Sequence, residues 1–362
     1  MEIHFRGNNG PLDKAIQDLI ELVGDIRRPG IIREMILASL KAGQEDDGRV
    51  DLKLMNTSLK EMRFTAKAFS AYRHVKKVTV FGSARTRPDE TTYKMARLLG
   101  QKLSKSGYMV ITGGGPGIMQ AVSEGAGPEY SFGVNIRLPF EQKPNPVIEG
   151  SLKNISYKYF FNRKVAFLKE SDAIALFPGG FGTLDEAMET LTLVQTGKRN
   201  PVPLVLVDEP GGTYWIRWIE FVKENLLAQG YISKSDLTLF ERVDSADDAV
   251  QRINQFYSRY HSLRYIDDRL VIRLISGIDQ QKMEELRVCF SDILRPQGEI
   301  YLSGPLPEEI DEPEIGHLPR LILDFKREDF GRLRELIDVI NRWRIAQGRN
   351  QLIELSCFLK LL

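Results

Sequence analysis

The segment Pro178-Gly179-Gly180-Phe181-Gly182-Thr183-Leu184-Asp185-Glu186 connects an apolar run to an amphipathic one. The apolar residues 173–177 before it are typical of a buried strand, and apolar residues recur after it at helical spacing. A glycine-rich turn between a strand and a helix lets backbone N–H groups surround an anion, and the helix dipole adds attraction. The segment therefore predicts an α/β fold with a phosphate site, and it places the Glu186 carboxylate one turn inside the helix.

The same residues also allow an interpretation that needs no ligand. Thr183-x-x-Glu186 matches a capping box, in which the two side chains satisfy N–H groups at the start of a helix. A cap does not need the three glycines at 179, 180 and 182, and these favour an anion site. Thr183 can serve either role, so both interpretations stay open.

Composition excludes several classes of protein. The chain has 362 residues, 42% hydrophobic and 27% charged, which is enough for two or three units with their own cores. A net charge of +1 gives no electrostatic case for binding nucleic acid or a membrane. The two cysteines, Cys289 and Cys357, and four scattered histidines predict neither a disulfide framework nor a metal site. With no apolar signal segment and no run long enough to span a bilayer, we expect a cytoplasmic protein.

Three regions follow one another along the chain. Residues 1–74 carry apolar stripes at helical spacing over 12–23, 32–40 and 52–62, with a polar break at 44–48, and predict a helical N-terminal region. Residues 75–264 alternate short apolar runs with helical stretches such as 93–106 and 157–169. The expected strands lie at 78–81, 108–111, 132–136, 173–177 and 202–207. This alternation predicts a Rossmann-like, doubly wound parallel sheet with ligands at the carboxyl ends of its strands.

The pattern changes in the third region, residues 268–362. Strands are expected at 270–275, 299–302 and 321–325, and helices at 279–294 and 329–346, with a closing strand at 352–359. The order predicts a small α+β domain of the ferredoxin-like type. Since no catalytic constellation is visible there, we favour a regulatory or oligomerisation role over a second active site. A cut near Asp267 is accordingly expected to leave a folded and active protein.

Two further glycine segments lie where the expected strands end, and their sequences exclude several classes of ligand site. Gly82-Ser83 follows the first strand, and Thr112-Gly113-Gly114-Gly115-Pro116-Gly117 follows the second. A dinucleotide fingerprint fails, because the sixth position from Gly113 is Ile118 and no acid ends the next strand. A Walker A loop lacks its Lys-Ser/Thr pair, and no histidine lies near an elbow serine. A phosphate-binding α/β site with arginine and carboxylate remains.

Arg163 is the candidate arginine. A helix over 157–169 would align Tyr159, Arg163 and Phe167 on one side, at a spacing of four residues. By spacing alone this arginine fits a solvated surface position as well as a lined pocket.

Four ordered blocks together resemble the LOG (LONELY GUY) family of nucleoside 5′-monophosphate phosphoribohydrolases, some of which carry an older "lysine decarboxylase" label. The blocks are Gly113-Gly114-Gly115-Pro116-Gly117-Ile118-Met119, Asn135-Ile136-x-Leu138-Pro139-x-Glu141-Gln142, Tyr159-Phe160-Phe161-x-Arg163-Lys164 and Pro178-Gly179-Gly180-x-Gly182-Thr183-x-x-Glu186. The resemblance covers about residues 76–258 and leaves both terminal regions outside it. Gln120 departs from the pattern, since many relatives carry glutamate after the methionine.

The resemblance implies an enzyme that cuts the N-glycosidic bond of a nucleoside monophosphate, AMP-like or a cytokinin nucleotide, without metal or cofactor. Arg163 and Glu186 match the catalytic pair of the family. The remaining candidate residues are assigned to phosphate and nucleotide binding: Gly82, Ser83, Gly114, Gly115, Gly117, Met119, Lys164, Gly179, Gly180, Gly182 and Thr183. The older label would make Lys164 a Schiff-base lysine, but no pyridoxal phosphate site is recognisable around it. Family members are homodimers with the site near the subunit interface, so a homodimer or higher homo-oligomer is expected.

Overall fold

The computed structural model describes residues 10–45, 48–138 and 143–343. The chain divides into two compact units, Met1–Ala66 and Lys67–Leu362. Several predicted features lie outside the described residues: Pro139, Glu141 and Gln142 of one motif block, the strand expected at 352–359, and Cys357. Within the described part of the chain, no helix combines the length and apolarity that a membrane span requires.

The first unit is helical, as predicted. It contains α1 (Pro11–Val23), α2 (Pro29–Glu45) and most of α3 (Arg49–Phe69). Ile16, Ile20 and Leu37 form the small core between α1 and α2. Gly24 ends α1 in a left-handed conformation, with φ of 67°, and its N–H donates to the carbonyl of Ile20 at 3.2 Å.

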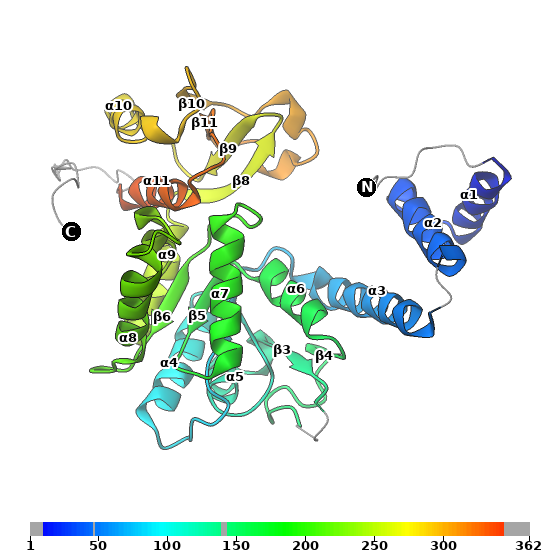
Figure 1. Ribbon diagram of the computed structural model, residues 1–362, viewed down its shortest axis with the longest axis horizontal. Coiled ribbons are helices and arrows are strands. Elements are labelled where there is room, and N and C mark those ends of the chain that lie inside the picture. The colour runs from blue at the N-terminus through cyan, green and yellow to red at the C-terminus, as the bar shows by residue number, and fades with distance from the viewer. Residues whose placement is uncertain (1–9, 46–47, 139–142, 344–362) are drawn as a thin grey trace. The chain divides into compact units, whose positions relative to one another are not determined.

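A parallel sheet of seven strands forms the centre of the second unit, in the order β4-β3-β2-β1-β5-β6-β7 (Figure 1). The strands are β1 (Lys77–Phe81), β2 (Met109–Thr112), β3 (Ser131–Ile136), β4 (Asn154–Tyr157), β5 (Ala173–Leu176), β6 (Leu204–Val207) and β7 (Glu241–Val243). All five predicted strands are confirmed, and the predicted fold class with them. The chain order reverses at β1, which pairs with both β2 and β5. In folds of this kind, ligands bind at the carboxyl ends of the strands on either side of such a reversal.

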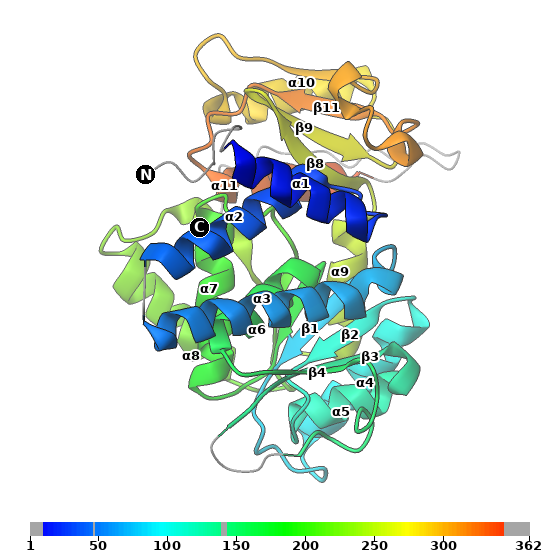
Figure 2. The ribbon, with the colours of Figure 1, turned by 90° about the vertical axis from the view of Figure 1, so that its right-hand side faces the viewer.

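Helices cover both faces of this sheet (Figures 1 and 2). One face packs on α4 (Thr91–Lys105), α5 (Ile118–Ala126) and α9 (Ala246–Phe256). The other face packs on α6 (Phe160–Glu170), α7 (Phe181–Gln195) and α8 (Tyr214–Phe221). Because the central strands are buried on both faces, they read as continuous apolar runs in the sequence.

The two edge strands of this sheet are not predicted from the sequence, and their composition explains why. In β4, exposed or half-buried Asn154 and Ser156 alternate with buried Ile155 and Tyr157. The β7 strand has three residues, of which two are charged, Glu241 and Arg242. Neither segment provides an apolar run, and β4 occupies the start of the helix predicted at 157–169.

A second, antiparallel sheet follows in the order β10-β11-β9-β8. Its strands are β8 (Tyr260–Ile266), β9 (Arg269–Leu274), β10 (Ile300–Ser303) and β11 (Arg320–Leu323). The β8 strand is not predicted, because its buried residues have a spacing of three and do not alternate. A bulge lies between Tyr260 and Ser262, and Leu263 and Ile266 are buried on opposite faces of the sheet. The β8 strand pairs with β9 at the sheet edge. The four-stranded sheet is therefore completed by a strand that precedes β9 in the chain.

The two faces of the second sheet are covered differently. The helices α10 (Gln280–Cys289) and α11 (Phe330–Arg342) pack on one face. On the other face the loop between β10 and β11 is fixed by Glu309, which is buried between Arg273 and Arg320 at 2.8 and 2.9 Å. Burial alone would raise the pKa of Glu309, but hydrogen bonds from Arg320, the Leu306 N–H and Arg273 lower it to about 2.

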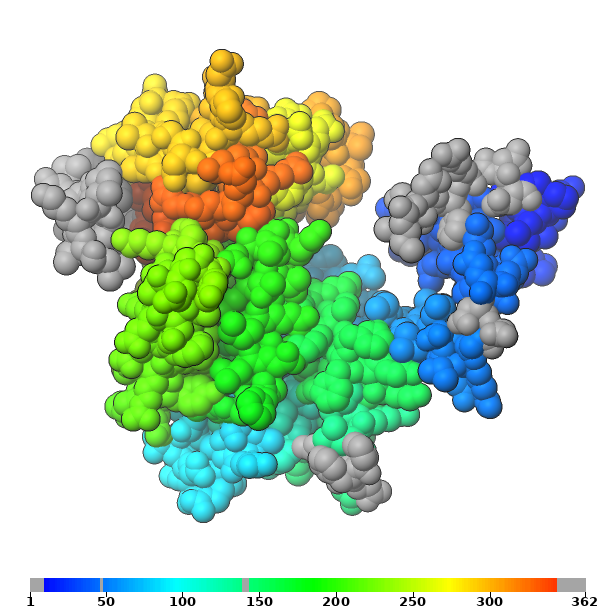
Figure 3. All heavy atoms as spheres, in the orientation of Figure 1, coloured from blue at the N-terminus to red at the C-terminus, as the bar shows by residue number. Residues whose placement is uncertain are grey.

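Helix α11 returns to the parallel sheet and joins the two halves of the second unit (Figure 3). The buried Arg334 donates to the carbonyl of Val202 at 3.0 Å and pairs with Glu241 at 3.3 Å. Near the end of α11, the side-chain carbonyl of Asn341 accepts from the N–H groups of Arg259 and Tyr260 at 2.9 Å. The second sheet is thus attached to the first one through buried polar contacts as well as through the chain.

Candidate active site

The glycine segments after β1, β2 and β5 meet at the carboxyl edge of the parallel sheet. The N–H of Ser83 donates to the carbonyl of Pro178 at 3.0 Å, and the carbonyl of Ser83 accepts from Ile118 at 3.0 Å. Gly117 has a positive φ of 65°, and a Cβ there would lie 2.6 Å from the backbone of Ala84. Three loops that are far apart in the sequence therefore form one continuous backbone surface, as the strand order requires.

The start of α7 removes the capping-box interpretation of Thr183 and Glu186, which is wrong. The helix begins at Phe181 with Gly180 as its N-cap, and no side chain caps it. Thr183 and Glu186 lie inside the helix, and both are buried. The first N–H groups of a helix have no partner within the helix, so the start of α7 can still accept an anion.

Two of the loop glycines are not explained by the packing of the chain. A Cβ on Gly180 or Gly182 would meet no atom within 4 Å, and neither residue has a positive φ. By contrast, a Cβ on Gly179 would press against the Thr183 hydroxyl and lie 3.1 Å from the Ser83 nitrogen. The open space beside Gly180 and Gly182 is what a loop leaves when an external group approaches its backbone.

Arg163 lies beside the second glycine segment and not on an open surface. Its Nε donates to the carbonyl of Val134 at 2.9 Å, and its guanidinium lies 5.1 Å from the ring centroid of Phe167. A Cβ on Gly113 would approach Arg163 Nη2 to 2.6 Å and Met119 Sδ to 2.7 Å. Glycine at 113 is thus required by the arginine itself. Burial lowers the pKa of Arg163, and the nearby Glu186 carboxylate opposes that shift.

Glu186 is the most unusual group in the site. Its side chain is 7% exposed, and its Oε2 is buried without a hydrogen-bond partner among the described residues. Burial raises the pKa of Glu186 to about 7, although the positive charges of Lys164 and Arg163 act against this. A strongly shifted carboxylate next to an arginine and a glycine loop is typical of a functional site.

Lys164 is held by carboxylates on the adjacent helix. Its Nζ lies 2.8 Å from Asp185, 2.7 Å from Glu189 and 3.8 Å from Glu186. Burial opposes protonation, but the hydrogen bonds that Lys164 donates to Asp185 and Glu189 raise its pKa. A Schiff-base lysine needs a lowered pKa, so this geometry argues against the decarboxylase chemistry of the older label. Asp185 and Glu189 are engaged as partners of Lys164 and are not free acids.

Several residues that support the glycine loops carry no signal in the sequence. The Tyr214 hydroxyl donates to the carbonyl of Gly179 at 2.7 Å. Asn145 donates its backbone N–H to the carbonyl of Gly114 at 2.8 Å and its side-chain amide to that of Gly115 at 3.3 Å. Asn135 of β3, which belongs to one of the motif blocks, lies beside Gly114 and hydrogen-bonds Asn154. Tyr214 and Asn145 belong to no motif, and only the fold brings them to the glycine loops. The described residues contain no group of three potential metal ligands.

The carboxyl edge of the parallel sheet thus brings three glycine segments together with Arg163 and Glu186 in a Rossmann-like fold. The family described as "Possible lysine decarboxylase" matches residues 116–253. Residues 116–253 form a domain of this LOG/lysine decarboxylase-like family, and the chain extends beyond it at both ends.

Individual relatives agree with that assignment. The chain is 28% identical over 196 residues to the cytokinin riboside 5′-monophosphate phosphoribohydrolase LOG of Oryza sativa subsp. japonica, covering 52% of this chain and 76% of the relative. It is 25% identical over 236 residues to the phosphoribohydrolase LOG5 of Arabidopsis thaliana, covering 63% and 96%. A solved structure of the molybdenum cofactor carrier protein from Chlamydomonas reinhardtii is 18% identical, with a TM-score of 0.36, and covers 50% of this chain and 97% of that protein.

Proposed function

We propose that the protein hydrolyses the N-glycosidic bond of nucleoside 5′-monophosphates and releases the free base and ribose 5-phosphate. The observation that carries the proposal is the buried, unpartnered carboxylate oxygen of Glu186 beside a glycine-rich helix start and Arg163. The proposal also draws on the similarity to LOG phosphoribohydrolases.

The phosphate of the substrate would bind at the start of α7, where Gly180 and Gly182 leave open space and the Thr183 hydroxyl is near. The bond to be cut would then lie above Glu186. Breaking it builds positive charge on the ribose, and an ionised Glu186 would stabilise that charge or orient the attacking water. Binding energy from the phosphate would hold the ribose in position while the bond breaks.

Departure of the base calls for a positive or acidic group. Many glycosidases use a second carboxylic acid for this step. Here the neighbouring Asp185 and Glu189 are paired with Lys164, so Arg163 is the better candidate. Its guanidinium is fixed by Val134 and Phe167, and it would donate to the departing base or hold the carboxylate in place.

We also propose that the protein works as a homodimer or higher homo-oligomer. Large apolar side chains on α6 and α7 are exposed around the site: Phe160, Phe161, Val165, Phe181 and Met188. Phe181, next to the phosphate loop, is 93% exposed. Large apolar side chains exposed on two neighbouring helices are what a contact with another chain would cover.

The decisive experiment is incubation with AMP, followed by chromatography for adenine and ribose 5-phosphate. Adenosine is the matched control, since it lacks the phosphate. We expect kcat/KM for AMP to exceed that for adenosine by about a hundredfold or more, equivalent to about 3 kcal/mol of phosphate binding energy. Tight binding of AMP with no release of base would instead indicate a nucleotide carrier. A panel of AMP, GMP, CMP and isopentenyl-AMP would then establish the preferred base.

A further inference from the structure

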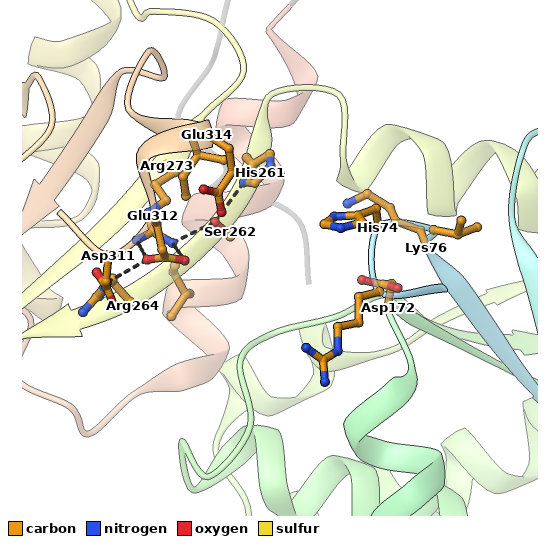
Figure 4. A pocket seen from close by; sticks show the side chains of 14 residues that line it. His74, Lys76, Asp172, His261, Ser262, Arg264, Arg273, Asp311, Glu312 and Glu314 are labelled. Carbon is orange, nitrogen blue, oxygen red and sulfur yellow. Dashed lines mark hydrogen bonds and ion pairs between the residues drawn. The ribbon is translucent and has the colours of Figure 1, made fainter. Parts of the chain in front are cut away.

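A cavity of about 790 Å³ lies between the parallel sheet and the second sheet, away from the glycine loops (Figure 4). One wall comes from the parallel sheet, where Lys76 directly precedes β1 and Asp172 directly precedes β5. The glycine loops follow the opposite ends of these same two strands. The cavity is therefore a separate site, and its volume falls within the range of about 300–1,000 Å³ that is typical of small-molecule sites.

The first wall carries cations that are not neutralised. Arg73, His74 and Lys76 lie in the segment that leads into β1. Among the described residues, neither Arg73 nor Lys76 forms an ion pair with a carboxylate. The Lys76 ammonium lies 3.4 Å from the ring centroid of Tyr257 in a cation–π contact, at the wall of the cavity. Asp172 attracts Lys76, but its carboxylate already accepts the N–H of Lys77 at 2.8 Å.

The opposite wall comes from β8, β9 and the loop between β10 and β11. Its carboxylates Asp311 and Glu312 are occupied by Arg264, at 3.1 and 2.6 Å, and Glu312 also by Arg273. Glu314 is the remaining acid of the lining and is exposed. Two uncharged or weakly basic groups remain on this wall, the imidazole of His261 and the hydroxyl of Ser262, which are 2.9 Å apart.

The electrostatic environment of His261 is positive. Burial lowers the pKa of His261, and Lys76, Arg273, Arg320 and His317 lower it further. Lys76 acts on His261 from one wall and Arg273 from the other, although acidic residues also line the cavity. An anion between these two cations would be attracted to both.

We propose that this cavity binds a small phosphorylated anion, held by Arg73 and Lys76 from one sheet and by His261 and Ser262 from the other. A phosphoryl group presents several acceptor oxygens, and the two walls supply guanidinium, ammonium, imidazole and hydroxyl donors that match them. The inference does not depend on the reaction proposed for the glycine loops.

Inorganic pyrophosphate is a suitable probe, and calorimetric titration of the full-length protein is the measurement. We expect Lys76→Met and Arg73→Gln each to weaken binding at one site by about tenfold or more, because each removes a charged donor. Methionine keeps the packing against Tyr257. Lys223→Met is the matched control, since this exposed lysine lines neither site, and it should leave binding unchanged. A parallel titration with ribose 5-phosphate would distinguish a sugar phosphate from a free inorganic anion as the preferred ligand.

Two further measurements separate this inference from the proposed reaction. Thr183→Val tests pyrophosphate binding at the glycine loop, so each site has its own variant. In the unmodified protein, the NMR signals of the His261 ring, assigned through His261→Gln, should shift when pyrophosphate is added. Wild-type affinity in both Lys76→Met and Arg73→Gln, or an unchanged His261 signal at saturating pyrophosphate, would overturn the proposal.

Discussion

Oε2 of Glu186 lies 3.8 Å from the ammonium of Lys164, and no hydrogen-bond donor reaches it among the described residues. Lys164 instead gives its short contacts to Asp185 and Glu189. The Glu186 carboxylate is therefore attracted electrostatically by Lys164 but accepts no hydrogen bond from it. A carboxylate in this condition is stabilised further when positive charge develops next to it, which is what cleavage of a glycosidic bond provides.

Activity should depend on pH through Glu186. Because its pKa is about 7, kcat/KM for AMP should rise with pH through that region as the carboxylate ionises. Lys164→Met removes an attraction that lowers the pKa of Glu186 and frees two carboxylates that raise it, so the inflection should move to higher pH. The phosphate of AMP titrates in both proteins and cancels in the comparison. Lys169→Met, on the exposed side of α6, is the control. Superimposable profiles for wild type and Lys164→Met would contradict this role of Glu186.

Replacing Glu186 should make the protein more stable while abolishing base release. The pKa of Glu186 is raised in the folded protein, so the folded state is favoured by protonation, and this advantage is lost as pH rises from about 4.5 through about 7. Glutamine carries no charge to bury. At pH 8 the free energy of unfolding of Glu186→Gln should exceed that of the wild type by on the order of 3 kcal/mol, and the difference should vanish near pH 4.5. Urea denaturation at pH 5 and pH 8 measures it, and calorimetry should still detect AMP binding. If Glu186→Gln is less stable than the wild type at pH 8, the ionised Glu186 carboxylate does not destabilise the folded protein.

Two glycines of the same segment, Gly182 and Gly179, should respond oppositely to substitution by alanine. Gly182 lies in the first turn of α7 with open space around its Cβ position, so Gly182→Ala should stabilise the protein by about 0.5–1 kcal/mol. The added methyl group would occupy the phosphate side of the loop and weaken AMP binding by about tenfold. Gly179→Ala should instead destabilise the protein by about 1–3 kcal/mol, because its methyl group would press on Thr183. Urea denaturation and calorimetry in a Glu186→Gln background test both. Unchanged AMP affinity in Gly182→Ala would show that the phosphate of AMP does not bind at this loop.

The domain boundary should be less simple than the sequence predicts. A cut after Asp267 would leave β8 without its partner β9 and would remove the hydrogen bond at 2.8 Å between Ser235 and Asp329. It would also remove Arg334, which is buried against Val202 and Glu241. We therefore expect this truncation to be aggregated or to unfold at a markedly lower temperature, because unpaired strands and unmet buried groups are costly. The full-length protein is the control. Light scattering and thermal unfolding measure both, and a monodisperse, stable protein ending at Asp267 would contradict the expectation.

Sequence reasoning succeeded where burial on both sides of a strand produced an apolar run. The central strands β1, β2, β3, β5 and β6 were predicted for that reason, and the glycine segments between strand and helix were placed correctly. The edge strands β4 and β7 were missed because their residues alternate or are charged. The β8 strand was missed because a bulge and burial on both faces leave apolar residues at 260, 263 and 266, a helix-like spacing.

For the candidate site, sequence motifs identify the residues but not their contacts. Arg163 and Glu186 belong to motifs, but the approach of Arg163 to Gly113 depends on β2, β3 and α6 together. The ion pairs of Lys164 with Asp185 and Glu189 also appear only in the folded chain, and they make both carboxylates poor candidates for a general acid. The support of the loops by Tyr214 and Asn145 matches no motif, because their hydrogen bonds to the loop carbonyls arise only in the folded chain.

The contact between Arg334 and the carbonyl of Val202 also has a consequence for synthesis of the protein. The two residues are 132 positions apart, and Val202 lies just before β6 of the parallel sheet. Domains generally fold as the chain leaves the ribosome, and contacts at long separation form last. A nascent chain that has not yet reached residue 334 would hold a parallel sheet with an unmet carbonyl just before β6. Translational pausing between these two positions would therefore prolong the time in which newly made protein needs chaperones.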